Sequence, residues 1–275
     1  MCGRASGEGA VEGGSRRGPF EMSELEFELP RGGTVTGDAA HRLLGVTPDM
    51  VLEAFGAESD CLCEVLAGID DAAFARASGC PPWSVAELAF HVRMTIGRLP
   101  GMLDGPEPAG GSLVSAAGYY RADQRFSGAT NADRIESAQR GAAALPDAAA
   151  RARDFAAVRS HAWTLLGATS PGRVVRTRHG DRMLLPEFLR TRVFELAVHG
   201  LDLAAALDRA PWMTDLAAEV TGELLLPEAA GARLRTDAGW DQVTLIAKLT
   251  GRRPATSAES RLIESLLGGQ RLSLG

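Results

Sequence analysis

The feature that most constrains this chain is an apolar stretch, residues 192–202, that carries ionisable side chains. Glu195 and His199 are four residues apart, so on a helix they project from one face, one turn apart. Their neighbours are apolar on nearly every side, namely Val193, Leu196, Ala197, Val198 and Leu201. A carboxylate and an imidazole in a buried helix must pair with each other or bind a metal. The stretch therefore predicts a helical core that contains a polar site.

Helices also dominate the prediction for the rest of the chain. Apolar periodicity and start signals indicate helices over residues 48–69, 84–99, 131–145, 147–167, 186–207, 213–225 and 257–267. Ser84 followed three residues later by Glu87 is typical of a capping box, and Pro186 fits the first turn of a helix. A short strand is expected over 173–177. Residues 104–129 form a connection that is too long to be without a role in a compact domain.

Three regions are expected. Residues 1–46 are rich in glycine and polar residues at their start and predict a disordered or irregular N-terminal arm. Residues 47–208 hold the predicted helical bundle. From residue 209 onward Pro211 and Pro227 interrupt the pattern, so 209–275 are expected to form a small C-terminal subdomain.

Composition excludes several classes of function. The net charge is −6 and 23% of the residues are charged, which does not predict a nucleic-acid-binding protein. Lys248 is the only lysine among many arginines, so an isolated arginine is weak evidence for a site. No apolar run reaches the roughly 20 residues of a membrane span, and the N-terminus does not match a signal peptide. Four cysteines do not predict a disulfide framework, and we expect a cytoplasmic protein.

A third ligand for a metal would have to come from another helix, and His91 is the natural candidate. It lies in the middle of the predicted helix 84–99, among Leu88, Ala89, Phe90 and Val92. Two histidines and one carboxylate on facing helices form a triad that leaves coordination positions open. Two other interpretations remain open at this point: His91 as a core histidine, and Glu195 with His199 as an intrahelical pair.

Other polar residues compete with this assignment. His161 is the alternative ligand, whereas His41 and His179 fall in the arm and in a turn. Asp202 lies three residues after His199, where it would either orient the imidazole or act as a charge near the helix end. Cys61-x-Cys63 is either a metal or redox pair or two small apolar residues on a helix.

Three motifs resemble those of a known family, the DinB-like helical metalloproteins, and within it the mycothiol-dependent maleylpyruvate isomerases. Residues 80–92 (CPPWSVAELAFHV) resemble the family motif that contains the first metal-binding histidine. Residues 192–202, with Arg192, Glu195, His199 and Asp202 in register, resemble the helix that supplies the other two ligands. Leu249-Thr250-Gly251-Arg252 resembles a short motif near the end of the family's C-terminal domain. The resemblance covers about 47–255.

The resemblance implies a mainly α protein, a DinB-like four-helix bundle with a small C-terminal α/β subdomain. It implies a divalent metal, zinc, held by His91, Glu195 and His199, and mycothiol as a thiol cosubstrate. Arg252 and Asp202 are then the candidate catalytic residues. Arg93 and Arg192 are the alternative anion-stabilising and cofactor-binding arginines. No cysteine is recognisably placed beside a base, which fits an external thiol.

Three functions follow from these observations. The first is a mycothiol-dependent isomerase or S-transferase that acts on a small electrophile. The second is a biosynthetic enzyme of the same fold that exchanges or installs a thiol on a secondary metabolite. The third is a metal-binding sensor or interaction protein without turnover. In each case we expect a monomer or homodimer that binds neither nucleic acid nor membrane.

Overall fold

The computed structural model describes residues 45–121, 123, 126–226 and 228–267. Backbone contacts separate Met1–Thr47 from Pro48–Gly275, and all helices and strands discussed below belong to the second unit. The predicted N-terminal arm, and His41 with it, lies outside the described residues except for Gly45 and Val46.

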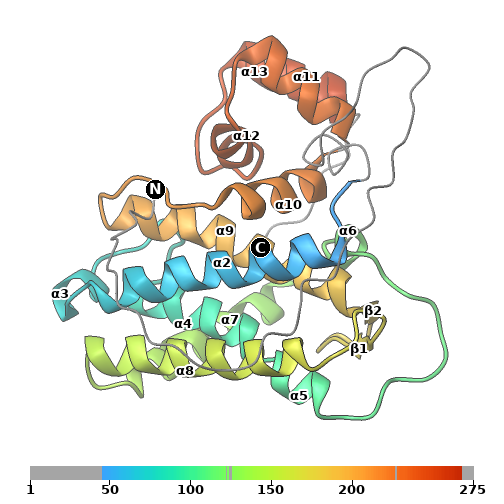
Figure 1. Cartoon of the computed structure of the whole chain (residues 1–275). Helices are drawn as coiled ribbons and strands as arrows, with labels where there is room; N and C mark the ends of the chain where they lie inside the picture. Colours follow the sequence, from blue (N-terminus) through green and yellow to red (C-terminus); the bar gives the residue numbers. More distant parts are fainter. Residues whose placement is uncertain (1–44, 122, 124–125, 227, 268–275) are drawn as a thin grey trace, which may run out of the picture. The chain divides into compact units, whose positions relative to one another are not determined.

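Four helices form a bundle: α2 (Pro48–Ala67), α4 (Val85–Ile96), α8 (Ala148–Gly167) and α9 (Leu185–Ala206). Helices α2 and α4 each pack against both α8 and α9, which closes the bundle (Figure 1). The largest buried side chains of these helices include Phe55, Leu88, Phe155 and Phe188. The mainly α class and the four-helix bundle are therefore confirmed.

None of the helices in the described part of the chain has the length and hydropathy of a membrane-spanning segment.

The predicted start signals begin the helices where expected. The Ser84 hydroxyl accepts from the backbone N–H of Glu87, and the Glu87 carboxylate accepts from the backbone N–H of Ser84, so the capping box of α4 is confirmed. Asp147 caps α8 by accepting from the backbone N–H of Ala150 at 2.7 Å. Pro186 stands in the first turn of α9, where its missing N–H costs no helical hydrogen bond.

The predicted end of the helix 84–99 was wrong. Helix α4 ends at Ile96, and a separate helix, α5 (Leu99–Leu103), follows it. Pro100 was expected to stop the first helix, but it lies in the first turn of α5 instead, a position that suits proline. Helix α7 (Gly128–Ala143) begins earlier than predicted, because Ser127 caps it by accepting from the backbone N–H of Thr130.

The long connection after α5 is held against a β-hairpin. Strands β1 (Val174–Arg176) and β2 (Arg182–Leu184) pair antiparallel. Arg173, just before β1, donates to the backbone carbonyl of Leu103 at the end of α5 at 3.2 Å, and Arg182 of β2 donates to that of Pro108 in the connection at 3.1 Å. The connection then forms the short helix α6 (Ala116–Tyr119) before α7. These contacts give residues 104–121 of the connection a defined path.

All secondary-structure elements in the described residues of the C-terminal part are helices, which corrects the expected α/β subdomain. It consists of α10 (Asp215–Leu225), α11 (Glu228–Ala238), α12 (Gln242–Leu249) and α13 (Ser257–Leu267). Ala230 and Leu234 of α11 are buried one helical turn apart, and they pack with Leu226, Trp240, Leu245 and Ile263. The described strands lie before α9 instead. The domain boundary at residue 208 stays a prediction. Helix α10, which follows this boundary, packs on both α2 and α9.

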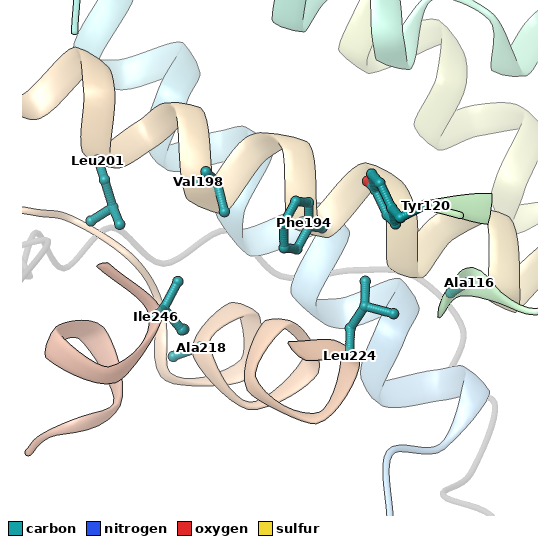
Figure 2. Packing of buried hydrophobic residues seen from close by; sticks show 8 residues of the cluster. All are labelled: Ala116, Tyr120, Phe194, Val198, Leu201, Ala218, Leu224 and Ile246. Carbon is teal, nitrogen blue, oxygen red and sulfur yellow. The ribbon is translucent and has the colours of Figure 1, made fainter. Parts of the chain in front are cut away.

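One face of α9 packs on this C-terminal part. Figure 2 shows Phe194, Val198 and Leu201 pointing from α9 toward residues that include Ala218 of α10 and Ile246 of α12. Tyr120, which follows α6, belongs to the same cluster. This apolar contact fixes the rotation of α9, so that the neighbouring face, which carries Glu195 and His199, is directed toward α4.

A buried carboxyl group lies where α2 meets the segment between α9 and α10. Glu58 is 1% exposed, and its Oε2 accepts from the backbone N–H of Thr214 at 2.9 Å. Its Oε1 finds no hydrogen-bond partner among the described residues. Burial raises the pKa of Glu58 to about 7, against an ordinary value of 4.5. Because the folded pKa is raised, the stability that this group contributes is present below its unfolded pKa and is lost as the pH rises through 7.

Glu58→Gln should therefore make the protein's stability less dependent on pH. The amide still accepts from Thr214 but never ionises, so the variant should avoid a loss on the order of 3 kcal/mol between about pH 5 and about pH 8. Denaturant unfolding at the two pH values measures the difference. Glu53→Gln, on the exposed side of the same helix, is the matched control and should follow the wild type. An equal pH dependence in Glu58→Gln and wild type would contradict the assignment.

Candidate functional site

The side chains of His91, Glu195 and His199 converge between α4 and α9. The Nε2 of His91 lies 3.5 Å and the Nε2 of His199 lies 3.3 Å from the same Glu195 oxygen, Oε2. The two imidazole rings stand edge to face, with centroids 5.1 Å apart. One ligand atom of each residue lies within 4.8 Å of the others. The predicted triad is thus brought together in space, with its ligand atoms facing one another.

Neighbouring side chains orient all three residues. Trp83 stacks on His91 with ring centroids 4.7 Å apart. Asp202 Oδ2 lies 3.0 Å from Nδ1 of His199, which directs Nε2 of that ring toward Glu195. The Tyr120 hydroxyl lies 3.4 Å from the second Glu195 oxygen, Oε1, and 3.2 Å from the Thr191 carbonyl. The site is therefore fixed by contacts from α4, α9 and the residue after α6.

Burial and close contacts shift the proton affinities of these groups. Burial lowers the pKa of His91 to about 4, so this imidazole is neutral at pH 7 and keeps a lone pair available. Burial alone would also lower the pKa of His199, but hydrogen bonds with Asp202, Cys80 and Glu195 outweigh it and raise the pKa well above its usual range. The same contacts with His199 and His91 outweigh the burial of Glu195 and lower the pKa of its carboxyl group. In the metal-free chain a proton thus balances the buried carboxylate.

This donor set fits a divalent ion. Two imidazole nitrogens and one carboxylate oxygen are typical of a catalytic zinc site that leaves a position open. Ligand atoms about 2.0–2.1 Å from a tetrahedral ion lie about 3.3–3.4 Å apart, close to the two nitrogen–oxygen distances here. The Nε2 of His91 faces Glu195 and is available to the site, whereas its Nδ1 is buried and has no partner among the described residues.

A second group of possible ligands shares His199 but suits a cation less well. Cys80 Sγ lies 3.0 Å from Asp202 Oδ2 and 3.9 Å from Nδ1 of His199. Arg252, however, donates to both Asp202 oxygens, at 3.1 and 3.0 Å, and its Nη2 lies 3.8 Å from the Cys80 sulfur. The guanidinium of Arg252 therefore already supplies the positive charge beside the Asp202 carboxylate. The donors on the side of His199 that faces Glu195 therefore suit a cation better than this second group does.

Both groups open on a cavity of about 420 Å³. Its wall combines apolar side chains with the triad and with several arginines, among them Arg192 and Arg252. A cavity of this size suits a small-molecule ligand. The site is thus reachable by a substrate, although His91 itself is only 7% exposed.

The predicted arginines have different surroundings. Arg252 and Arg192 line the cavity, and Arg192 is buried, with its guanidinium 4.7 Å from the Phe188 ring centroid. Arg93 lies outside the cavity lining and pairs with Asp154 of α8 at 2.7 and 3.0 Å. The structure therefore does not place Arg93 at the site, because its charge is used in an ion pair between bundle helices.

The alternative histidine and cysteines lie elsewhere. His161 is exposed on α8, and His179 lies at the cavity wall in the hairpin turn. Cys61 and Cys63 are half-buried on α2 without a disulfide. The expectation that no cysteine lies beside a base was wrong for Cys80, which contacts both Asp202 and His199.

Tyr120 was also missed by sequence reasoning. The chain has only two tyrosines, Tyr119 and Tyr120, and they are adjacent within the long connection. Both line the cavity. Two neighbouring amphipathic rings in an otherwise polar connection were a signal of a ligand-facing segment.

Comparisons with known proteins assign the chain to a class. The family model described as the mycothiol maleylpyruvate isomerase N-terminal domain matches residues 55–204, more than half of the chain. The chain therefore belongs to this family, whose members are related to an isomerase. The matched region contains His91, Glu195 and His199.

A solved structure, titled as the crystal structure of the mycothiol-dependent maleylpyruvate isomerase, aligns with a TM-score of 0.42 and 13% sequence identity. The alignment covers 64% of this chain and 68% of that chain. No curated protein matches the sequence.

Asp202→Ala should destabilise the protein strongly, because it leaves the buried charges of His199 and Arg252 without their partner. The Asp202 side chain is 4% exposed, so the free energy of unfolding should fall by about 3–5 kcal/mol. Asp208→Ala is the matched control: it breaks an exposed pair with Arg76 and should cost less than about 1 kcal/mol. Chemical denaturation measures both values, and equal losses would show that the Asp202 network is no more than a surface ion pair.

Proposed function

We propose that this protein is a metal-dependent enzyme in which mycothiol, a low-molecular-weight thiol, is the nucleophile for the isomerisation of a small electrophilic substrate or for S-transfer to it. The observation that carries the proposal is the convergence of His91, Glu195 and His199 on one wall of a ligand-sized cavity. Membership of the mycothiol maleylpyruvate isomerase family supports the choice of thiol.

His91, Glu195 and His199 would hold the ion, for which we propose zinc because the donor set is two imidazoles and a carboxylate. A zinc ion bound there would lower the pKa of an incoming thiol and keep its sulfur as the nucleophilic thiolate. Such an ion also takes the place of the proton that the buried Glu195 and His199 otherwise share.

The chain's own residues keep this arrangement in place. Asp202 accepts from Nδ1 of His199 and so holds its imidazole with Nε2 toward the cavity. Tyr120 donates to Oε1 of Glu195 and leaves Oε2 for the site. Both contacts remove rotational freedom before any ligand binds, which is the condition for efficient positioning.

Arg252 is the candidate group for stabilising negative charge on the substrate. In an isomerisation the thiolate adds to an activated double bond, the resulting single bond rotates, and elimination returns the thiol and the double bond. Electrons move onto a carbonyl oxygen after the addition and return during elimination. Arg252 lines the cavity and is anchored by Asp202 and by the Thr250 carbonyl, so it presents a fixed positive charge to that oxygen. In S-transfer the same thiolate displaces a leaving group and the conjugate is released.

The thiol is tested by adding mycothiol to protein in which cobalt(II) replaces the native ion. A new thiolate-to-cobalt charge-transfer band should appear, with release of about one proton per thiol bound at neutral pH, since free thiols are mostly protonated there. His91→Ala should lose the band. His161→Ala, the same change on the exposed face of α8, should keep it.

Cys80 requires its own control because its sulfur lies 3.9 Å from a His199 nitrogen. Cys80→Ser should retain the response to mycothiol. A band that is present before any thiol is added and disappears in Cys80→Ser would assign the sulfur to the chain itself. A spectrum that mycothiol does not change would reject the thiol-dependent function.

A further inference from the structure

The cavity has a charge opposite to that of the chain. The whole chain has a net charge of −6. Yet five arginines line the cavity, namely Arg98, Arg134, Arg178, Arg192 and Arg252. Among the described residues of the lining, Glu195 is the only carboxylate. The wall therefore has excess positive charge even with Glu195 ionised, and a metal ion at the triad would increase it.

Asp202 balances Arg252, but the other four arginines come together from separate elements. Arg98 lies between α4 and α5, Arg134 on α7, Arg178 in the hairpin turn and Arg192 on α9. Tyr119 lines the same cavity: the guanidinium of Arg192 lies 5.7 Å from its ring centroid, and the ring centroid of His179 lies 6.0 Å from it. Arg178 donates to Nε2 of His179 at 3.2 Å.

These guanidinium groups repel one another. Burial lowers the pKa of Arg98, and the charges of Arg178, Arg192 and Arg134 lower it further. Burial and the charge of Arg178 likewise lower the pKa of Arg134, although the charge of Glu195 acts in the opposite direction. Four segments of the fold thus bring like charges together in the lining of one cavity. An anion bound there would relieve the repulsion.

We propose that Arg98, Arg134 and Arg178, with Arg192 behind them, form a binding site for a doubly charged anionic group of a small molecule. Planar guanidinium forks match the paired oxygens of phosphates and carboxylates. A group with two negative charges balances several guanidiniums better than a single carboxylate does. Phosphate monoesters and dicarboxylates share this chemistry. Anion binding at this site does not depend on any thiol. That the bound small molecule is the electrophilic substrate rests on the proposed function.

Calorimetric titration with ligands of matched shape tests the proposal. Methyl phosphate carries nearly two charges at about pH 8, whereas methyl sulfate carries one. Malonate, with two negative charges, and acetate, with one, make the same comparison for carboxylates. All titrations use the full chain at one ionic strength, so that screening is constant. Methyl phosphate should bind about tenfold or more tightly than methyl sulfate, and Arg98→Gln and Arg178→Gln should each weaken it by about tenfold.

Arg153→Gln is the matched control, because it removes one arginine charge from the exposed face of α8 and should leave binding unchanged. Arg178 is exposed at the cavity rim, so its substitution leaves the core intact, and circular dichroism checks the fold. Tighter binding of malonate than of methyl phosphate, with the same arginine dependence, would support the site and assign it to dicarboxylates. No binding of either dianion, no preference for double charge, or an equal loss in Arg153→Gln would overturn it. Because no thiol is present, this result is separate from that of the cobalt experiment.

Discussion

Two carboxylates buried on one face of α9 determine the arrangement of the site. Glu195 and Asp202 are seven residues apart, with His199 between them, and both are largely removed from solvent. Ionised groups in such surroundings require close positive partners. The His199 imidazole serves both, through Nε2 to Glu195 and Nδ1 to Asp202. Arg252 completes the charge balance at the Asp202 end, whereas the neutral imidazole of His91 lies beside Glu195 at the other end. A metal ion between the two histidines and Glu195 is consistent with this requirement.

The bundle keeps these residues in place through ordinary packing. The apolar cluster around Phe194 and Val198 fixes the rotation of α9 (Figure 2), and the Ser84–Glu87 capping box fixes the start of α4, seven residues before His91. The close packing of α7 on α4 also helps to keep these residues in place. At Gly141 of α7, a Cβ would lie 1.9 Å from the ring of Phe90, so α7 packs directly on the residue beside His91. Helix packing therefore positions both the proposed metal site and the arginines of the cavity, on which the proposed anion site depends.

The sequence predicted those parts of the site that depend on local spacing. Glu195, His199 and Asp202 could be placed on one helix from the intervals between them, and the apolar neighbours of His91 predicted its burial. The contact of Cys80 with Asp202 could not be predicted, because it joins residues 122 positions apart through a loop. Arg93 was misassigned for the same reason, since its partner Asp154 is 61 residues away. In the C-terminal part, α11 was not predicted, because Pro227 and the glycine and alanines after it leave few large apolar residues to show a helical period.

Metal content measured by mass spectrometry tests most directly whether His91, Glu195 and His199 hold one divalent ion. The wild type and His161→Ala, which changes an exposed histidine of α8, should each carry about one ion per chain. His91→Ala and His199→Ala should lose most of it, since removal of a ligand or of its support commonly lowers metal affinity at least about tenfold. Full occupancy in both of these variants would contradict the triad and require another site for the ion.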